Sequence, residues 1–172
     1  FPTFLYHKNP IETGAFDQCE QQICECCGEG TIFTYVSTIY AVEDPEILCP
    51  WCIADGTASE KYEAAFTGEV ASTVSSTIED IILHKTPGYI GNQEEIWLTH
   101  CKDACCFLGT VNWQDIQNLG IEEEIVKYYD TYEHYNDLDI STLKKGLKSG
   151  HVSAYLFKCL HCNQYLLHND AD

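Results

Sequence analysis

The spacing of the cysteines constrains this chain more than any other feature of its sequence. Eleven of its 172 residues are cysteine, and most of them fall in pairs separated by two or three residues. Disulfides are rare in reducing compartments, and an odd number of cysteines does not suit a complete disulfide framework. A secreted disulfide scaffold stays open as an alternative, but paired spacing suits a tetrahedral metal ion better. The sequence therefore predicts metal sites that stabilise the fold.

The first predicted site combines two Cys-x-x-Cys pairs. Cys24 and Cys27, followed by Gly28, form the first pair; 21 residues lie between it and the second pair, Cys49 and Cys52. A gap of two residues lets both sulfurs of one turn reach an ion at about 2.3 Å, and glycine supplies the backbone freedom that such a knuckle needs. With a hairpin between the pairs and a helix at the second pair, this spacing predicts a structural zinc ion in a treble-clef or zinc-ribbon-like lobe.

The second predicted site joins distant parts of the chain. Cys101 and Cys105 are spaced by one helical turn, so both can face one point, and Cys159 with Cys162 can complete the tetrahedron. A metal ion bound in this way would fasten the C-terminal hairpin to the body of the protein.

Several other assignments of ligands stay open. The pairs can exchange partners between the two sites, and iron can occupy a site with four cysteines. A redox role for the 49–52 pair is a weaker alternative, because the expected βαβ context is missing. The residues that can substitute as ligands are Cys26, Cys106, His100 and His161.

The apolar patterning predicts an α+β fold. We expect a treble-clef or zinc-ribbon-like lobe over residues 1–70, packed on a mainly helical part over residues 71–172 that a zinc-knuckle hairpin closes; both can form one integrated domain. Expected strands cover residues 31–36, 37–42, 154–158 and 164–168. Expected helices cover residues 54–66, 78–84, 93–101, 113–119, 121–135 and 140–147.

The charge of the chain narrows the choice of partners. It carries 27 acidic residues against nine lysines, with no arginine, for a net charge of −18. Phosphate backbones would be repelled, so we expect no nucleic-acid ligand and favour a basic protein partner. No run of about 18 apolar residues is present, and the first residues lack the layout of a signal peptide, so we expect a cytoplasmic protein without membrane contact.

The sequence offers little sign of catalysis. Four thiolates close a zinc shell and leave no position for water, which favours a structural role. The histidines show no arrangement with Ser, Cys or carboxylates for nucleophilic catalysis, so we identify no catalytic residue and expect no enzymatic activity. An enzyme that uses exposed thiols such as Cys26 or Cys106 is the weaker alternative. A tyrosine stripe at Tyr128, Tyr129, Tyr132 and Tyr135 is expected to be half-buried core.

Several segments, in order and spacing, resemble the bacterial CbrC family. They are residues 2–7, 9–10, 13–14, 24–27, 48–56, 86–89, 97–105 and 157–162, which together span most of the chain. One departure stands at Cys106, where the family usually has a small residue.

The resemblance implies a role rather than a reaction. The CbrC family is associated with bacterial tolerance to a DNase-type colicin, has no established enzymatic activity and supplies no catalytic residues to carry over. Nuclease toxins are basic where they grip nucleic acid, so an acidic protein can occupy that surface. We therefore expect a zinc-stabilised immunity or tolerance protein that neutralises a nuclease-type toxin. The alternative is a zinc-ribbon regulatory adaptor for another cellular protein.

Overall fold

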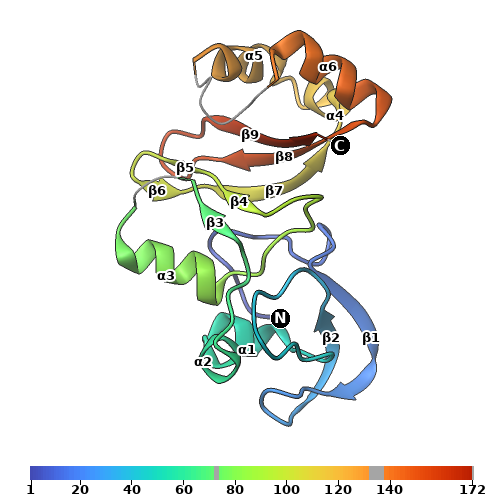
Figure 1. Ribbon diagram of the computed structural model, residues 1–172, viewed down its shortest axis with the longest axis vertical. Coiled ribbons are helices and arrows are strands. Elements are labelled where there is room, and N and C mark those ends of the chain that lie inside the picture. Colours follow the sequence, from blue (N-terminus) through green and yellow to red (C-terminus); the bar gives the residue numbers. More distant parts are fainter. Residues whose placement is uncertain (72–73, 132–137, 172) are drawn as a thin grey trace.

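A computed structural model describes residues 1–71, 74–131 and 138–171 and shows a mixed α/β fold. Layers succeed one another along the long axis in Figure 1: helices at one end, a three-stranded sheet beneath them, then short strands, and the N-terminal region at the other end. The strands are β1 (Phe16–Ile23), β2 (Gly30–Tyr35), β3 (Glu69–Val70), β4 (Ile96–Trp97), β5 (Thr99–His100), β6 (Asp103–Ala104), β7 (Cys106–Val111), β8 (Val152–Lys158) and β9 (Tyr165–Ala171). The helices are α1 (Pro50–Ala54), α2 (Thr57–Tyr62), α3 (Ser76–Lys85), α4 (Trp113–Asn118), α5 (Glu122–Thr131) and α6 (Ile140–Ser149).

The N-terminal region packs around its own hydrophobic cluster. Strands β1 and β2 form an antiparallel hairpin; α1 begins directly after Cys49 and contains Cys52, and α2 follows it. Three of the cysteines, Cys24, Cys49 and Cys52, are themselves buried members of this cluster, together with Phe16 and Phe66. The cysteines and the apolar side chains are therefore parts of one packing unit.

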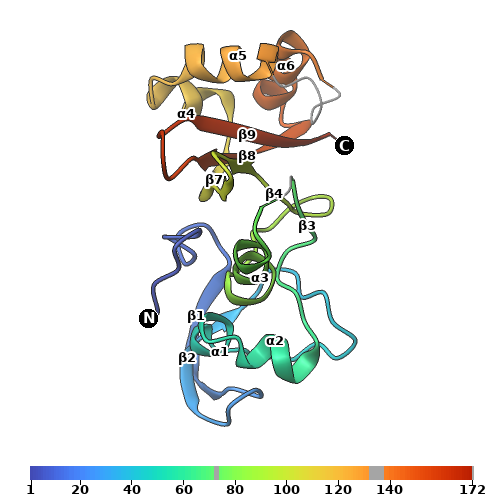
Figure 2. The same ribbon diagram turned by 90° about the vertical axis from the view of Figure 1, so that its left-hand side faces the viewer.

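The larger hydrophobic cluster lies around the antiparallel sheet β7-β8-β9. Helices α4, α5 and α6 cover one face of this sheet (Figure 2). Asn112 and Asp115 form a capping box at the start of α4, and Asp139 accepts hydrogen bonds from the first turn of α6. These caps satisfy amide groups that a helix leaves unpaired at its beginning, so the local sequence marks both helix starts.

Polar contacts connect the segments before residue 70 to the C-terminal part of the chain. The Phe107 amide donates to the Tyr6 carbonyl at 2.8 Å, and the Tyr6 hydroxyl donates to Asp103 at 2.7 Å. The buried carboxylate of Glu95 accepts hydrogen bonds from the hydroxyl groups of Thr38 and Tyr40. Because these contacts reach across residue 70, the N-terminal segment is attached to the sheet; the division into two lobes at that position stays a prediction.

Several expected elements are confirmed, and two are wrong. The strand at 31–36, the helices at 78–84, 113–119 and 140–147, and the terminal hairpin all form within a few residues of their expected bounds. The helix expected at 93–101 is wrong, because this segment forms the short strands β4 and β5. The strand expected at 37–42 is wrong: this segment forms only an isolated bridge between Tyr40 and Ala65, and its Thr38 and Tyr40 hydroxyls donate to Glu95.

The remaining differences concern the extent of the sheet and of two helices. Strand β7 is absent from the expected elements; it extends the expected terminal hairpin to a three-stranded sheet, on which the C-terminal part is organised. Of the helix expected at 54–66, only α2 forms; α1 ends at Ala54, and Gly56, whose φ of 87° favours glycine, separates the two. The helix expected at 121–135 is described only as α5; Tyr128 and Tyr129 are buried in it, and Tyr132 and Tyr135 lie outside the described residues. In the described ranges, none of the helices has the length and apolar character needed to cross a membrane.

His7 is buried and contacts the segments that carry Thr13 and Pro87. Its burial leads us to expect that the protein loses stability in acid. Its Nδ1 lies 2.8 Å from the Pro87 carbonyl and donates to it, and its Nε2 lies 2.6 Å from the Thr13 hydroxyl. Burial lowers the pKa of His7 to about 4 from an ordinary value near 6.5. The folded pKa lies below the unfolded one, so the contribution is fully present above pH 6.5 and is lost as pH falls towards 4. We expect about 3 kcal/mol of stability to be lost over this window.

The measurement is the free energy of unfolding between about pH 7 and pH 4 in the native chain and in His7→Gln. Glutamine keeps an amide donor and acceptor but does not titrate, so the variant is expected to show a shallower pH dependence. Metal ligands that protonate in acid act equally in both proteins and cancel in the comparison. Parallel pH profiles in the two proteins would show that His7 does not titrate in this way.

Candidate metal centres

The first candidate centre consists of the Sγ atoms of Cys24, Cys27, Cys49 and Cys52, which all lie within 4.8 Å of one another. The Sγ distances are 3.9 Å from Cys24 to Cys52, 4.0 Å from Cys27 to Cys49 and 3.5 Å from Cys49 to Cys52. Tetrahedral zinc with bonds of about 2.3 Å requires sulfurs about 3.8 Å apart. The donor set and its dimensions therefore fit a zinc ion.

Backbone hydrogen bonds shape the knuckle that carries Cys24 and Cys27. The Cys24 amide donates to the Glu29 carbonyl at 2.8 Å, and the Gly28 amide donates to the Cys24 carbonyl at 2.8 Å. Gly28 has a φ of 77°, in the left-handed region that glycine enters without strain. The predicted role of this glycine is thereby explained.

Electrostatics favour a thiolate at the first centre. Burial raises the pKa of Cys24, but backbone N–H groups of Cys27, Cys49 and Cys26 outweigh this effect and lower the pKa to about 7. The Cys49 amide donates directly to Cys24 Sγ at 3.3 Å. Burial raises the pKa of Cys49 to about 11, so without a cation the four sulfurs cannot all ionise near neutrality. A bound cation would supply the missing stabilisation.

The second candidate centre differs from the expected one by a single ligand. The structure brings together His100, Cys101, Cys159 and Cys162 within 4.8 Å of one another. His100 Nδ1 lies 3.3 Å from the sulfurs of both Cys101 and Cys162. Three thiolates and one imidazole are a common donor set for structural zinc.

Cys105 does not belong to this centre, which corrects the expected ligand set. Residues 99–104 form the hairpin β5–β6, and Cys101 and Lys102 occupy its turn with positive φ angles of 54° and 64°. Because this segment is a hairpin and not a helix, the spacing of Cys101 and Cys105 does not place their sulfurs at one point. The Cys105 amide donates to the Leu98 carbonyl, and its carbonyl accepts from the Trp97 indole, so the side chain is fully buried in the apolar core.

The knuckle at Cys159 repeats the geometry of the knuckle at Cys24. The Cys159 amide donates to the Gln164 carbonyl at 2.8 Å, and the Asn163 amide donates to the Cys159 carbonyl at 3.2 Å. Asn163 has a φ of 62° and takes the place that glycine has in the first knuckle, since asparagine tolerates this conformation better than most residues. Burial raises the pKa of Cys159, but N–H groups of Cys162 and His161 together with the His100 side chain lower it to about 6.

The other proposed substitutes are occupied elsewhere. His161 Nε2 lies 2.7 Å from Oδ2 of Asp103, and the other oxygen of this carboxylate accepts a hydrogen bond from Tyr6. Cys106 is buried, and its thiol is 3.6 Å from the Phe107 carbonyl. Cys26 is half-buried and stands outside both groups. His100 was among the open alternatives, and its position next to Cys101 was the only signal for it in the sequence.

The two centres differ in exposure. In the first, only Cys27 is exposed, whereas in the second both Cys101 and Cys162 are exposed. The second centre joins the β5–β6 turn to the tip of the β8–β9 hairpin, two segments that lie at one side of the molecule in Figure 1. A metal ion there would fasten these two hairpins to each other, in agreement with the expected effect of the second site.

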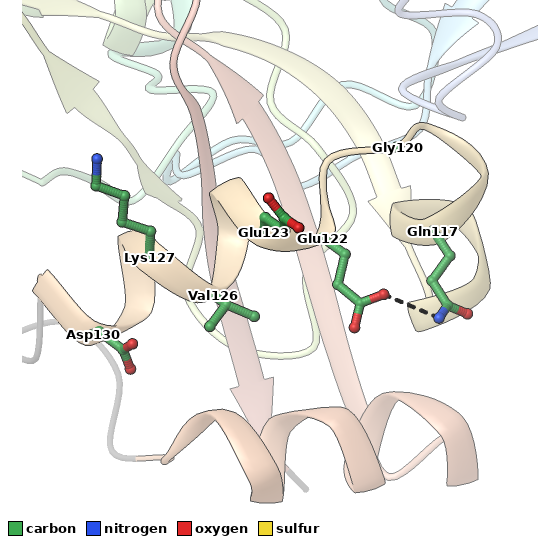
Figure 3. Close-up of a pocket in the computed structure, with 7 residues that line it drawn as sticks. All are labelled: Gln117, Gly120, Glu122, Glu123, Val126, Lys127 and Asp130. Carbon is green, nitrogen blue, oxygen red and sulfur yellow. Dashed lines mark hydrogen bonds between the residues drawn. The ribbon is translucent and has the colours of Figure 1, made fainter.

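A surface cavity outside both centres lies along α5. Figure 3 shows that its side chains come mainly from α5, with Gln117 contributed by α4. Gln117 donates to Glu122, and Lys144 pairs with the same carboxylate at 3.2 Å. The cavity is lined by Gln117, Gly120, Glu122, Glu123, Val126, Lys127 and Asp130. Most of these lining residues are charged or polar. Within the described part of the chain, none of them belongs to either candidate metal centre.

Comparison with known proteins places the chain in a family. Residues 1–171 match the family described as "Uncharacterised protein family (UPF0167)". UPF0167 protein Mb2317 of Mycobacterium bovis is 34% identical over 98% of this chain and 92% of its own length. UPF0167 protein PA1536 of Pseudomonas aeruginosa is 34% identical over 99% of this chain and 96% of its own length. No solved structure matches the chain significantly. From this agreement over nearly its full length, the chain belongs to the UPF0167 family.

Proposed function

We propose that this protein is a zinc-stabilised acidic binding protein which neutralises a nuclease-type bacterial toxin in the cytoplasm by direct contact. The observation that carries the proposal is the net charge of −18 on a fold whose two candidate metal centres each offer four ligand atoms. A tetrahedral ion with four protein ligands has no open position for water, so both centres suit a structural role. If both centres are structural, the negative charge of the protein is the feature that we assign to binding a partner.

The resemblance to the CbrC family supports the same role. That resemblance is compatible with membership of UPF0167, and it connects the acidic charge with tolerance to a DNase-type colicin. A basic nucleic-acid-binding surface is complementary to an acidic protein, and such complementarity accelerates association. A regulatory adaptor for a basic cellular protein would use the same surface and is the second candidate.

A thiol-dependent enzyme receives less support. Cys106 is 3% exposed, and burial raises the pKa of its thiol, so few molecules carry the reactive thiolate. Cys26 is more accessible, but it lies within the knuckle and no histidine contacts it among the interactions of the described residues. Both thiols are therefore poor candidates for a nucleophile.

The proposal predicts salt-sensitive inhibition of a nuclease. The purified protein is mixed with the isolated nuclease domain of a DNase colicin, and DNA cleavage and binding are measured from about 50 to 200 mM salt. We expect inhibition at stoichiometric amounts and a dissociation constant that rises at least about tenfold over this range, since screening weakens charge attraction.

A basic protein of similar size without nuclease activity serves as the control. Equal binding to this control, or uninhibited DNA cleavage, would contradict the toxin assignment. Affinity purification of the tagged protein from its native host separates the second candidate: a reproducible basic housekeeping partner, in the absence of toxin, would support the adaptor.

A further inference from the structure

Two cavities beside the first metal centre together form a groove. One is lined by residues of the cysteine knuckles and of α1 and α2, and the other extends towards α3; their volumes are about 420 and 330 Å³. They share Asp55, Thr57 and Glu60, so we treat them as one surface, the knuckle groove. Helices α1, α2 and α3 lie next to one another in both views of the chain (Figures 1 and 2). The volumes fall in the range of pockets that bind small ligands and side chains.

An exposed tryptophan lies at one end of the knuckle groove. Trp51 is 47% exposed, whereas Trp97 and Trp113 are 0% and 2% exposed. The sulfurs of Cys49 and Cys52 belong to the metal centre, and Trp51, one of the two residues between them, lines the groove. The ring of Phe1 packs at a centroid distance of 6.4 Å from that of Trp51. An indole face that remains accessible is the best of the natural aromatic surfaces for a cation.

The charges around Trp51 favour a positive ligand. Asp55 and Glu60 line the groove, and the Asp55 carboxylate is oriented by hydrogen bonds from the Thr57 amide and hydroxyl at 2.9 and 2.6 Å. The ammonium group of Lys61 donates to the carbonyls of Glu25 and Cys26 at 2.8 and 2.9 Å, so it is engaged by the knuckle. A zinc ion held by four thiolates would add about two negative charges nearby.

At its other end the groove reaches a compensated group of charges. Asp80 lies 2.9 Å from His84 Nδ1 and 3.7 Å from Lys85 Nζ. With Lys61 included, the lining near Trp51 keeps a net negative charge, and an aromatic face and two carboxylates occur there together. Anionic ligands are disfavoured there, and a neutral apolar ligand would bring no positive charge to the two carboxylates.

We propose that the knuckle groove binds a basic peptide segment of a partner protein. One Lys or Arg side chain of the segment lies over the Trp51 indole, and its charge is met by Asp55 and Glu60; the adjoining backbone follows the groove towards α3. This inference rests on the proposed function for the existence of a basic partner and adds the place and chemistry of the contact. Cation–π contact and carboxylates together discriminate a basic side chain from a neutral one of the same length.

The test uses a short synthetic peptide of alternating lysine and glycine and the same peptide with every lysine acetylated. Binding to the zinc-loaded chain is measured by titration calorimetry, and quenching of the exposed Trp51 fluorescence reports on contact at the groove. Trp51→Ala and the double variant Asp55→Asn/Glu60→Gln are expected to weaken binding of the basic peptide about tenfold. Asparagine at position 55 can still accept the hydrogen bonds from Thr57, so the loop is kept.

The matched control is Glu122→Gln/Glu123→Gln, which removes the same charge from the cavity along α5 (Figure 3). It is expected to weaken binding by no more than about twofold, because distant charges are screened. Trp51→Phe should retain part of the affinity, since phenylalanine also offers a ring face. The zinc content of each variant shows that the first centre is intact.

The proposal is overturned if the basic peptide does not bind, if the acetylated peptide binds equally well, or if the control variant loses as much affinity as the groove variants. Its failure is distinct from failure of the proposed function. If a toxin binds the native chain and Trp51→Ala with the same affinity, the groove is not the contact and the acidic binding role stands. If no basic protein binds the native chain, the proposed function itself fails.

Discussion

Replacing Cys49 with serine is expected to remove one zinc ion and to unfold the N-terminal region. Cys49 is buried, its sulfur lies 3.5 Å from that of Cys52, and its amide donates to Cys24 Sγ. Zinc contributes about 10–16 kcal/mol in small zinc-stabilised folds, as much as the entire stability of a typical domain. Three cysteines of this centre also belong to the hydrophobic cluster, so loss of the ion is expected to disrupt the packing around it.

The measurement combines zinc content by elemental analysis with hydrogen exchange of the amides in β1 and β2. Near-complete loss of protection in this hairpin is expected, while protection in β8 and β9 is reduced less. Cys26→Ser is the matched control, because Cys26 stands in the same knuckle outside the ligand group. Retention of two zinc ions and of native protection in the Cys49→Ser variant would rule out this centre as a structural metal site.

The second prediction distinguishes the ligand set of the structure from the one expected from spacing. His100→Ala is expected to lower the zinc affinity of the second centre by more than about a hundredfold, because removing a ligand costs more than removing a residue that only orients one. The first centre keeps its ion, so zinc content falls from two ions per chain to one. The exposed hairpin tips at Cys101 and Cys162 should then react rapidly with a thiol reagent.

Cys105→Ala is the paired variant, and it should retain both ions. It removes a buried sulfur from the core and is expected to cost about 1 kcal/mol of stability without affecting metal content. Thermal unfolding and zinc analysis of both variants give the comparison. If Cys105→Ala loses one ion and His100→Ala retains two, then Cys105, as expected from the spacing of the cysteines, is the fourth ligand and His100 is not.

The sequence was most informative where the structure is local. A Cys-x-x-Cys turn is defined by a few residues, and both knuckles have the hydrogen-bond pattern that this spacing requires. Helix starts at Asn112 and Asp139 also depend on neighbouring side chains only, and both form as expected. By contrast, the apolar pattern of residues 106–111 was too short to separate from its surroundings, so β7 became apparent only through its pairing with β8.

The same contrast explains the candidate centres and the groove. By itself, the sequence determined the composition of the first centre, the presence of a second one and the strong acidity of the chain, because spacing and charge are properties of the chain. Only the tertiary structure decided that His100 stands where Cys105 was expected, since the hairpin β5–β6 turns Cys101 outward while the Trp97 indole and the Leu98 carbonyl hold Cys105 in the core. The knuckle groove also became apparent only in the tertiary structure, because α1 packs against both α2 and α3. Such contacts join residues distant in sequence, and no local pattern encodes them.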